Sequence, residues 1–266
     1  DHRDLHSFPT RRSSDLPDPP PAPEDHELMV HGHQLEHLSF LSLQPSEADA
    51  CLLAKPVKPK NSEFDMRKAG PEEIKGFEQS DSAEWQTIVD MGAVRVCSLE
   101  ESNEVRRKLG HRVIASRMVR RKKPMPGIGN FKYKSRWCVL GHGDPDSGSY
   151  KTFSPMPSTE AISLFFQLAL CLGLKMSFAD VKSAFCQSNP LNRPQGPLFA
   201  EACAGLGLPK GTLVELIVPV YGLDDAPIRW HHTVLEFLFS LGFERSLFEP
   251  CWLTKKTNGK IEAMIM

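Results

Sequence analysis

Residues 178–187 read FADVKSAFCQ, and the interpretation of the whole chain depends on this stretch. Phe178, Ala179 and Val181 are apolar, which predicts a short buried strand. Asp180 is the acid within it, and a carboxylate on a core strand costs free energy unless a positive group meets it. Two interpretations are open. Asp180 could cap a turn or pair with a nearby lysine, or it could bind a magnesium ion, which prefers oxygen ligands.

Length and composition indicate an ordinary globular protein. The chain has 266 residues, enough for one or two domains, with 40% hydrophobic and 24% charged residues. The net charge of −1 leaves the class of partner open. Seven cysteines without motif spacing argue against a disulfide framework and for reduced thiols in an intracellular setting. No secretory signal and no apolar run of ~18 residues is present, so no membrane association is expected.

Residues 1–70 are expected to lie outside the folded domain. Residues 1–16 contain SFPTRRSSDL, which resembles the translation of a sequencing-library adapter; the alternative is a native polar terminus. Residues 17–70 are broken by prolines and poor in aromatic residues, which predicts a disordered linker. Four histidines and Cys51 lie in this linker, but their spacing fits no closed tetrahedral zinc site.

The rest, residues 71–266, alternates helix and strand patterns, which predicts an α+β fold. Ser80 or Asp81 is expected to cap the first helix, and Trp85 to face the core. The second helix follows Ser158 or Thr159, is nearly all apolar, and is expected to pack under the sheet. Asn258-Gly259 predicts a hairpin turn. Helices are expected over 81–91, 161–172 and about 227–241, and strands within 178–187 and over 213–220 and 251–256, with a return strand from 261.

A strongly basic region lies between residues 105 and 143, where the sequence contains no Asp or Glu. Two segments of alternating pattern, 111–123 and 131–140, flank the turn sequence PMPGIGN, which predicts a β-hairpin with one basic face. A solvated face is the ordinary explanation of a charge run. Here the single sign and the interleaved aromatic residues favour contact with phosphates. The residues expected to contact nucleic acid are Arg117, Arg120, Arg121, Lys122, Lys123 and Lys132.

Five sequence blocks in one order carry a family resemblance. They are KSRWCVLGH (134–142), KTFSPMPS (151–158), FADVKSAFCQ (178–187), VYGLDDAPIRWHH (220–232) and LGFERSLFEPCWL (241–253). Over about residues 80–266 the chain resembles the reverse transcriptase domain of Ty1/copia-type retrotransposon polyproteins. The resemblance implies a right-hand polymerase with the basic hairpin as fingers and an antiparallel palm sheet backed by helices. It also implies template-directed addition of deoxynucleotides to a primer, assisted by two magnesium ions.

The resemblance also implies roles for single residues. Asp180 matches the first of three catalytic acids, and the carbonyl of Val181 would be a further metal ligand. Asp224 and Asp225 resemble metal ligands by residue type but precede a helix, so they are expected to act as caps. The residues implied to bind the nucleotide are Lys134 and Arg136 at the triphosphate, Phe185 under the sugar (or, alternatively, as a core aromatic), and Tyr221 and Gly222 beneath the nucleotide.

The family's second and third acids form an Asp-Asp pair that would follow Met266. We therefore expect a C-terminally truncated fragment that lacks the thumb and RNase H domains and is inactive by itself. Two alternatives stay open: a catalytically dead nucleic-acid-binding remnant, and an unrelated α+β structural domain. The resemblance implies an RNA or DNA template-primer, deoxynucleoside triphosphates, and the integrase and RNase H parts of a Pol polyprotein as partners. It also implies an intracellular location, in a cytoplasmic particle or the nucleus.

Overall fold

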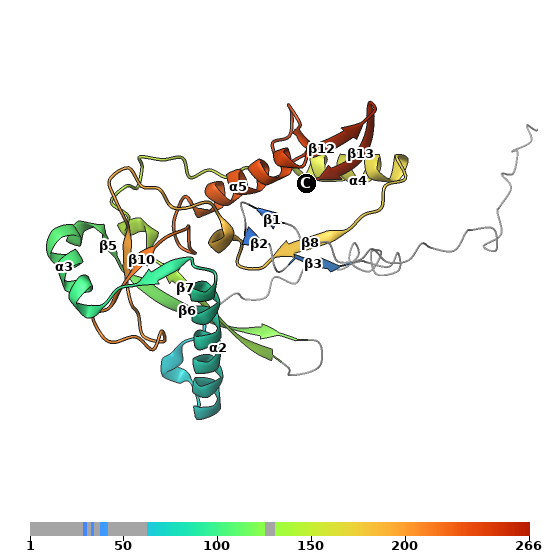
Figure 1. Cartoon of the computed structure of the whole chain (residues 1–266). Helices are drawn as coiled ribbons and strands as arrows, with labels where there is room; N and C mark the ends of the chain where they lie inside the picture. Colours follow the sequence, from blue (N-terminus) through green and yellow to red (C-terminus); the bar gives the residue numbers. More distant parts are fainter. Residues whose placement is uncertain (1–28, 31–32, 35–37, 42–62, 126–130) are drawn as a thin grey trace, which may run out of the picture. The chain divides into compact units, whose positions relative to one another are not determined.

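The computed structural model describes residues 29–30, 33–34, 38–41, 63–125 and 131–266 (Figure 1). The chain divides into two compact units, residues 1–36 and 37–266. In the first unit, β1 (Met29–Val30) pairs antiparallel with β2 (His33–Gln34). These strands and β3 (Leu38–Leu41) lie in the segment predicted as a linker. Most of that segment falls outside the described residues, as do residues 1–16. β3 and all later elements belong to the second unit.

The second unit mixes helices and strands, which confirms the α+β class. Its helices are α2 (Pro71–Asp90), α3 (Leu99–Leu109), α4 (Thr159–Cys171) and α5 (Ala226–Ser240), with short 3-10 helices η2 (Met66–Lys68), η3 (Gly110–Arg112), η4 (Gly141–Gly143) and η5 (Ala184–Gln187). Its strands are β3 (Leu38–Leu41), β4 (Val94–Val96), β5 (Val113–Ile114), β6 (Ser116–Pro124), β7 (Phe131–Val139), β8 (Phe178–Val181), β9 (Phe199–Glu201), β10 (Leu213–Leu216), β11 (Glu244–Arg245), β12 (Leu253–Thr257) and β13 (Lys260–Ile265). Within the described parts of the chain, no helix has the length and apolar character needed to cross a bilayer.

The strands form several small sheets. A four-stranded sheet has the order β4-β10-β9-β5, in which only β5 and β9 run parallel. β11, β12 and β13 form an antiparallel sheet, and β6 pairs with β7. β8 pairs antiparallel with β3. Among the described residues, the strands predicted for the antiparallel palm sheet lie in separate sheets, since β8 pairs with β3 and the β12–β13 hairpin pairs with β11.

Helix α2 begins at Pro71, well before the predicted start near Asp81. Gly70 precedes it, and the Gly70 amide donates to the Glu73 carboxylate at 2.8 Å, as in a capping box. Asp81 is thus an interior helix residue, and its buried carboxylate cannot act as the expected cap. Trp85 does face the core, where its ring meets Trp137 edge-on at 5.4 Å.

Helix α4 confirms its predicted cap but not its predicted burial. Ser158 accepts a hydrogen bond from the Ala161 amide at 3.0 Å, which fixes the first turn. The expectation that α4 packs under a sheet is wrong, since Leu164 is 55% and Leu170 68% exposed. Its contacts are made at one side, where the Phe165 ring lies 5.5 Å from that of Trp252.

The C-terminal elements follow the sequence prediction closely. Asn258 and Gly259 both have positive φ (52° and 75°), as a two-residue hairpin turn requires, and they connect β12 to β13. Leu235 and Leu238 of α5 pack on Leu253 of β12. The predicted helix end, hairpin turn and return strand are all confirmed.

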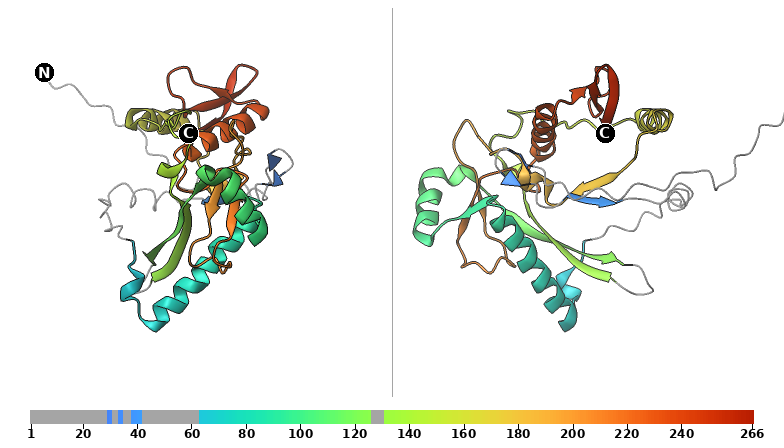
Figure 2. Two further views of the ribbon diagram at one scale, coloured as in Figure 1. Left: turned by 90° about the vertical axis from the view of Figure 1, so that its left-hand side faces the viewer. Right: turned by 45° about the vertical axis from the view of Figure 1, so that its right-hand side comes forward.

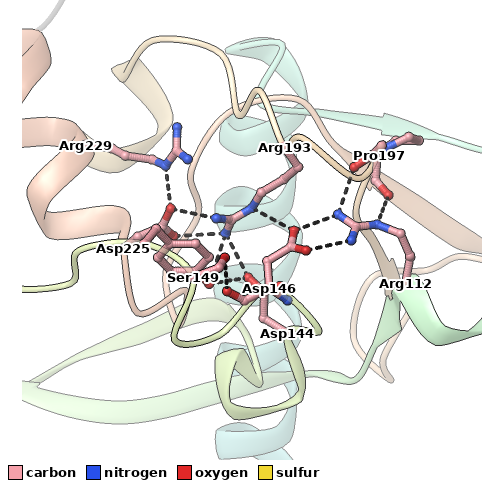
Figure 3. A network of polar contacts seen from close by, with 10 residues as sticks. Arg112, Asp144, Asp146, Ser149, Arg193, Pro197, Asp225 and Arg229 are labelled. Carbon is pink, nitrogen blue, oxygen red and sulfur yellow. Dashed lines mark hydrogen bonds and ion pairs between the residues drawn. The ribbon is translucent and has the colours of Figure 1, made fainter.

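A buried network of arginines and aspartates joins loops that are distant in the sequence (Figure 3). The Arg112 guanidinium is fully buried and binds both oxygens of Asp146, at 3.0 and 2.9 Å. It also donates to the carbonyls of Gly196 (2.8 Å) and Pro197 (2.9 Å). The hydrogen bonds from Arg112 to the Asp146 carboxylate hold the pKa of Asp146 below its usual range.

Arg193 forms the second half of the network. Its guanidinium donates to Asp225 at 2.9 and 3.1 Å and to Asp144 at 2.8 Å, and it stacks on the Tyr150 ring at 4.2 Å. Arg229 also pairs with Asp225. Asp225 therefore stands at the N-cap position of α5 but makes no side-chain cap bond, which corrects the prediction. Its carboxylate instead holds two arginines, and Asp224 is exposed.

Replacing Arg193 with methionine should strongly destabilise the second unit. The change leaves two buried aspartates without their main partner, and breaking a buried pair in this way costs about 3–5 kcal/mol. Arg229→Met is the matched control, with an expected loss of about 1 kcal/mol or less, because Asp225 keeps Arg193. Urea unfolding followed by tryptophan fluorescence measures both. Equal losses for the two variants would contradict this account.

Candidate nucleic-acid interface

The hairpin β6–β7 places its basic residues on two different faces. The strands pair from Ser116↔Val139 to Pro124↔Phe131, and directly opposite residues share a face. Helix α2 lies along one face, as Figure 2 shows. The side chains on the face toward α2, here called the inner face, are largely buried; they include Met118, Trp137 and Ser135. The basic residues of the outer face are Arg117, Arg121, Lys123, Lys132, Lys134 and Arg136.

Two of the six predicted nucleic-acid contacts point to the inner face instead. The Arg120 Nε lies 3.1 and 3.0 Å from the two oxygens of Asp81, and Lys122 pairs with Glu73. The Lys122 ammonium also lies 4.6 Å from the centre of the Phe131 ring. Acids of α2 therefore already neutralise Arg120 and Lys122, and this corrects the prediction of a single basic face that contained them.

The outer face keeps its charge. Arg117 pairs with Glu63 at 2.8 Å, and that pair is exposed. Within ranges 63–125 and 131–266, no carboxylate pairs with the other five cations of this face, which are all exposed: Arg121, Lys123, Lys132, Lys134 and Arg136. Cations without protein partners are what a phosphate backbone needs.

The edge of β7 that does not pair with β6 is hydrogen-bonded to α2. Ser80 donates from its hydroxyl to the Tyr133 carbonyl at 3.3 Å and accepts from the Ser135 amide at 2.9 Å. Gly76, one turn earlier, allows the close approach, because a Cβ there would lie 2.3 Å from the Tyr133 ring. The sequence suggested Ser80 only as a cap, and no local pattern marks it as a strand-edge contact.

The same edge continues into the 221–222 segment. The Val139 amide donates to the Tyr221 carbonyl at 2.9 Å, and the Gly141 amide to the Gly222 carbonyl at 3.1 Å. Gly222 has φ +99°, and a Cβ on it would lie 2.0 Å from the Val139 carbonyl oxygen. Glycine is thus required here by both conformation and space.

Three predicted nucleotide-site residues meet at this point. The Arg136 guanidinium lies 4.1 Å from the centre of the Tyr221 ring, and the Phe185 ring lies 5.0 Å from the same ring. Burial raises the pKa of Tyr221, although the charge of Arg136 opposes the shift. Lys134 lies on the same face as Arg136, two residues away. The structure therefore brings the predicted set Lys134, Arg136, Phe185, Tyr221 and Gly222 into one region.

Glu84 belongs to this region and was not predicted. It lies one turn after Ser80 on α2 and is half-buried. Burial raises its pKa, while the charges of Arg136 and Lys134 act in the opposite direction. No local sequence pattern marks it, because its neighbours on β7 lie about fifty residues away along the chain.

Asp180 belongs to a different sheet from the hairpin, the one formed by β3 and β8. It lies on β8 opposite Ser39 and is exposed, so the expected buried strand is wrong in its burial. Val181 is half-buried. In the described ranges, Asp180 makes neither the cap bond nor the lysine pair of the structural alternative, and no group of three His, Cys, Asp or Glu side chains is placed to hold a metal ion. One carboxylate and one carbonyl do not fit a pair of magnesium ions.

Gly222→Ala should destabilise the chain by about 2–4 kcal/mol, since the added methyl group meets backbone that cannot move without breaking two hydrogen bonds. Gly173 has φ +66° with nothing within 4 Å of an added Cβ, which makes Gly173→Ala the matched control. The control should cost about 1 kcal/mol, from conformation alone. Urea unfolding of both variants checks this; similar losses would show that the contact with Val139 is unimportant.

One of three comparisons with known proteins found a match. A sequence profile of the family described as reverse transcriptase (RNA-dependent DNA polymerase) matches residues 103–265, which is more than half of the chain. No match was found among curated proteins or among solved structures. Template-primer nucleic acid and nucleotides are the substrates of such a domain. The chain belongs to the reverse transcriptase (RNA-dependent DNA polymerase) family.

Proposed function

We propose that residues 71–266 form the fingers and part of the palm of a reverse transcriptase from a Ty1/copia-type retrotransposon Pol polyprotein. The observation that carries the proposal is the meeting of Arg136, Phe185 and Tyr221, which come from three separate sequence blocks. The Arg136 guanidinium lies on the Tyr221 ring at the end of a basic hairpin and forms no ion pair within ranges 63–125 and 131–266, so it can bind a phosphate ligand.

Each part of this region has a proposed role. Lys134 and Arg136 bind the triphosphate, because ammonium and guanidinium groups form charge-assisted bonds to phosphate oxygens. The rings of Phe185 and Tyr221 offer an apolar surface for the sugar and base. The outer face of β6–β7 binds the phosphates of the template-primer. Integrase and RNase H parts of the polyprotein are the proposed partners, in an intracellular particle or the nucleus.

Catalysis is proposed to use divalent magnesium in the intact polymerase, with Asp180 and the Val181 carbonyl as ligands. A two-metal reaction needs carboxylates from more than one element, to position both ions against the attacking and leaving oxygens. Within residues 63–125 and 131–266, Asp180 is the one carboxylate that we propose for that role. The 266 residues are therefore proposed to bind nucleic acid without polymerising DNA.

A catalytically dead, nucleic-acid-binding remnant is the second candidate, and the observation behind it is that no second carboxylate is grouped with Asp180 in ranges 63–125 and 131–266. Reading the genomic DNA past the Met266 codon separates the two. An in-frame Asp-Asp pair within about ten codons, the length of one more strand and turn, supports the polymerase. A stop codon or unrelated sequence there supports the remnant.

The outer face of the hairpin should dominate binding to nucleic acid. Lys123 and Lys132 lie directly opposite each other, and the double variant Lys123→Ala/Lys132→Ala should weaken binding to a single-stranded oligonucleotide. The plot of the logarithm of the association constant against the logarithm of salt concentration has a negative slope. Its magnitude should decrease by about 1.4, because two phosphate contacts are lost. Fluorescence anisotropy at several salt concentrations measures this.

The matched control for that variant is Arg107→Ala/Lys108→Ala, which removes two exposed cations from α3. It should leave the salt slope unchanged. If both double variants weaken binding equally, the hairpin is not the interface and net charge alone explains the affinity.

The purified 266-residue chain should not extend a primer. With a primed RNA template, deoxynucleotides and magnesium, we expect no incorporation above background, while a known reverse transcriptase extends the same substrate. Asp180→Asn should leave oligonucleotide binding unchanged, because the side chain is exposed on the β3–β8 sheet, whereas the predicted phosphate contacts lie on the β6–β7 hairpin. Magnesium-dependent extension that is lost in Asp180→Asn would refute the proposed inactivity.

A further inference from the structure

The segment just before α2 is hydrogen-bonded to the free edge of β6. The Ser135 amide of β7 is bonded to Ser80 and not to Arg120, its partner in the register. The carbonyl of Arg120 therefore points to the edge of β6 that β7 leaves free. The Phe64 amide donates to this carbonyl at 2.7 Å. The chain thus runs along the hairpin edge before it enters α2 at Pro71.

The side chain of Phe64 anchors this segment. Its ring lies 4.9 Å from the ring of Phe77, which is fully buried on α2. The Lys122 ammonium lies 4.9 Å from the centre of the same Phe64 ring. One backbone bond and two ring contacts together determine where the preceding residue, Glu63, meets the hairpin.

Glu63 lies on the outer face of the hairpin, where it binds Arg117. The Arg117 Nη1 atom donates to both oxygens of the Glu63 carboxylate, at 2.9 and 2.8 Å. Arg117 is the one outer-face cation with an acidic partner within ranges 63–125 and 131–266. Guanidinium groups bind carboxylate and phosphate oxygens with the same donors. The Glu63 carboxylate therefore takes the place that a phosphate of the nucleic acid would take at Arg117.

We propose that residues 63–64 form an internal strap that lowers the affinity of the hairpin for nucleic acid. Phe64 holds the strap in place, and Glu63 occupies Arg117 in competition with a phosphate group. This inference rests on the proposed function of the outer face. A strand that contacts all six outer cations must first open the Glu63–Arg117 pair, after which Arg117 contributes one further phosphate contact.

The exposure of the pair makes this competition reversible. The side chains of Arg117 and Glu63 are 53% and 39% exposed, so a ligand reaches them from solvent. Exposed ion pairs change an equilibrium constant by up to about fivefold. A phosphate contact adds about 0.7 to the magnitude of the salt slope for a single strand. Loss of the strap should therefore change affinity and salt dependence together.

The test is fluorescence anisotropy of the full chain with a labelled single-stranded oligonucleotide, at several salt concentrations around about 0.15 M. We expect Glu63→Gln to bind about two- to fivefold more tightly than wild type. The magnitude of its salt slope should increase by about 0.7. In Glu63→Gln/Arg117→Ala the slope should return to the wild-type value, because the freed guanidinium is gone. Glu78→Gln removes an exposed acid from α2 and, as the matched control, should equal wild type in both measurements.

The outcomes that overturn the inference are distinguishable from failure of the proposed function. If Lys123→Ala/Lys132→Ala weakens binding but Glu63→Gln equals wild type, the strap is refuted and the interface stands. If Glu78→Gln gains as much as Glu63→Gln, or if Glu63→Gln/Arg117→Ala keeps the increased slope, Arg117 does not explain the gain and the strap is again refuted. If neither Lys123→Ala/Lys132→Ala nor Glu63→Gln changes binding, the proposed interface falls, and the strap with it.

Discussion

The arrangement of the site depends on the hydrogen bonds made by one edge of β7, the edge that does not pair with β6. A strand edge exposes amides and carbonyls that must find partners. Here Ser80 of α2 bonds the edge at Ser135, and the carbonyls of Tyr221 and Gly222 bond it further on. One strand thus fixes a helix, a hairpin and a distant loop relative to each other. Arg136 lies on the Tyr221 ring because the Tyr221 carbonyl is bonded to β7 at Val139, three residues after Arg136.

The alternation of side chains along the hairpin divides one run of basic residues into two functions. Two of the eight cations in β6 and β7, Arg120 and Lys122, face α2, where Asp81 and Glu73 neutralise them. The others face outward, and five of them have no acidic partner among the described residues. A charge run therefore does not act as a unit. Its capacity to bind phosphate is set by the cations that have no acidic partner among the described residues.

The sequence predicted features that depend on neighbouring residues and missed those that depend on distant ones. The Ser158 cap and the Asn258-Gly259 turn are local, and the structure has both. The early start of α2 was missed because Pro71 lies where helix and linker signals mix. The partners Arg112 and Asp146 are 34 residues apart, and no spacing rule connects them. Likewise, the meeting of Arg136 with Tyr221 was accessible only through the family resemblance.

The pairing of acids distinguishes structural carboxylates from a candidate metal ligand. Asp225 lies beside a sequence motif that resembles a metal site, yet its oxygens are committed to Arg193 and Arg229. A buried carboxylate in such pairs is stabilised as an anion and has no oxygen directed to solvent. Asp180 is the opposite case, because its carboxylate is exposed and forms no hydrogen bond or ion pair among the described residues. A divalent cation needs acids of this second kind, because a ligand already bonded to arginine would first have to lose that bond.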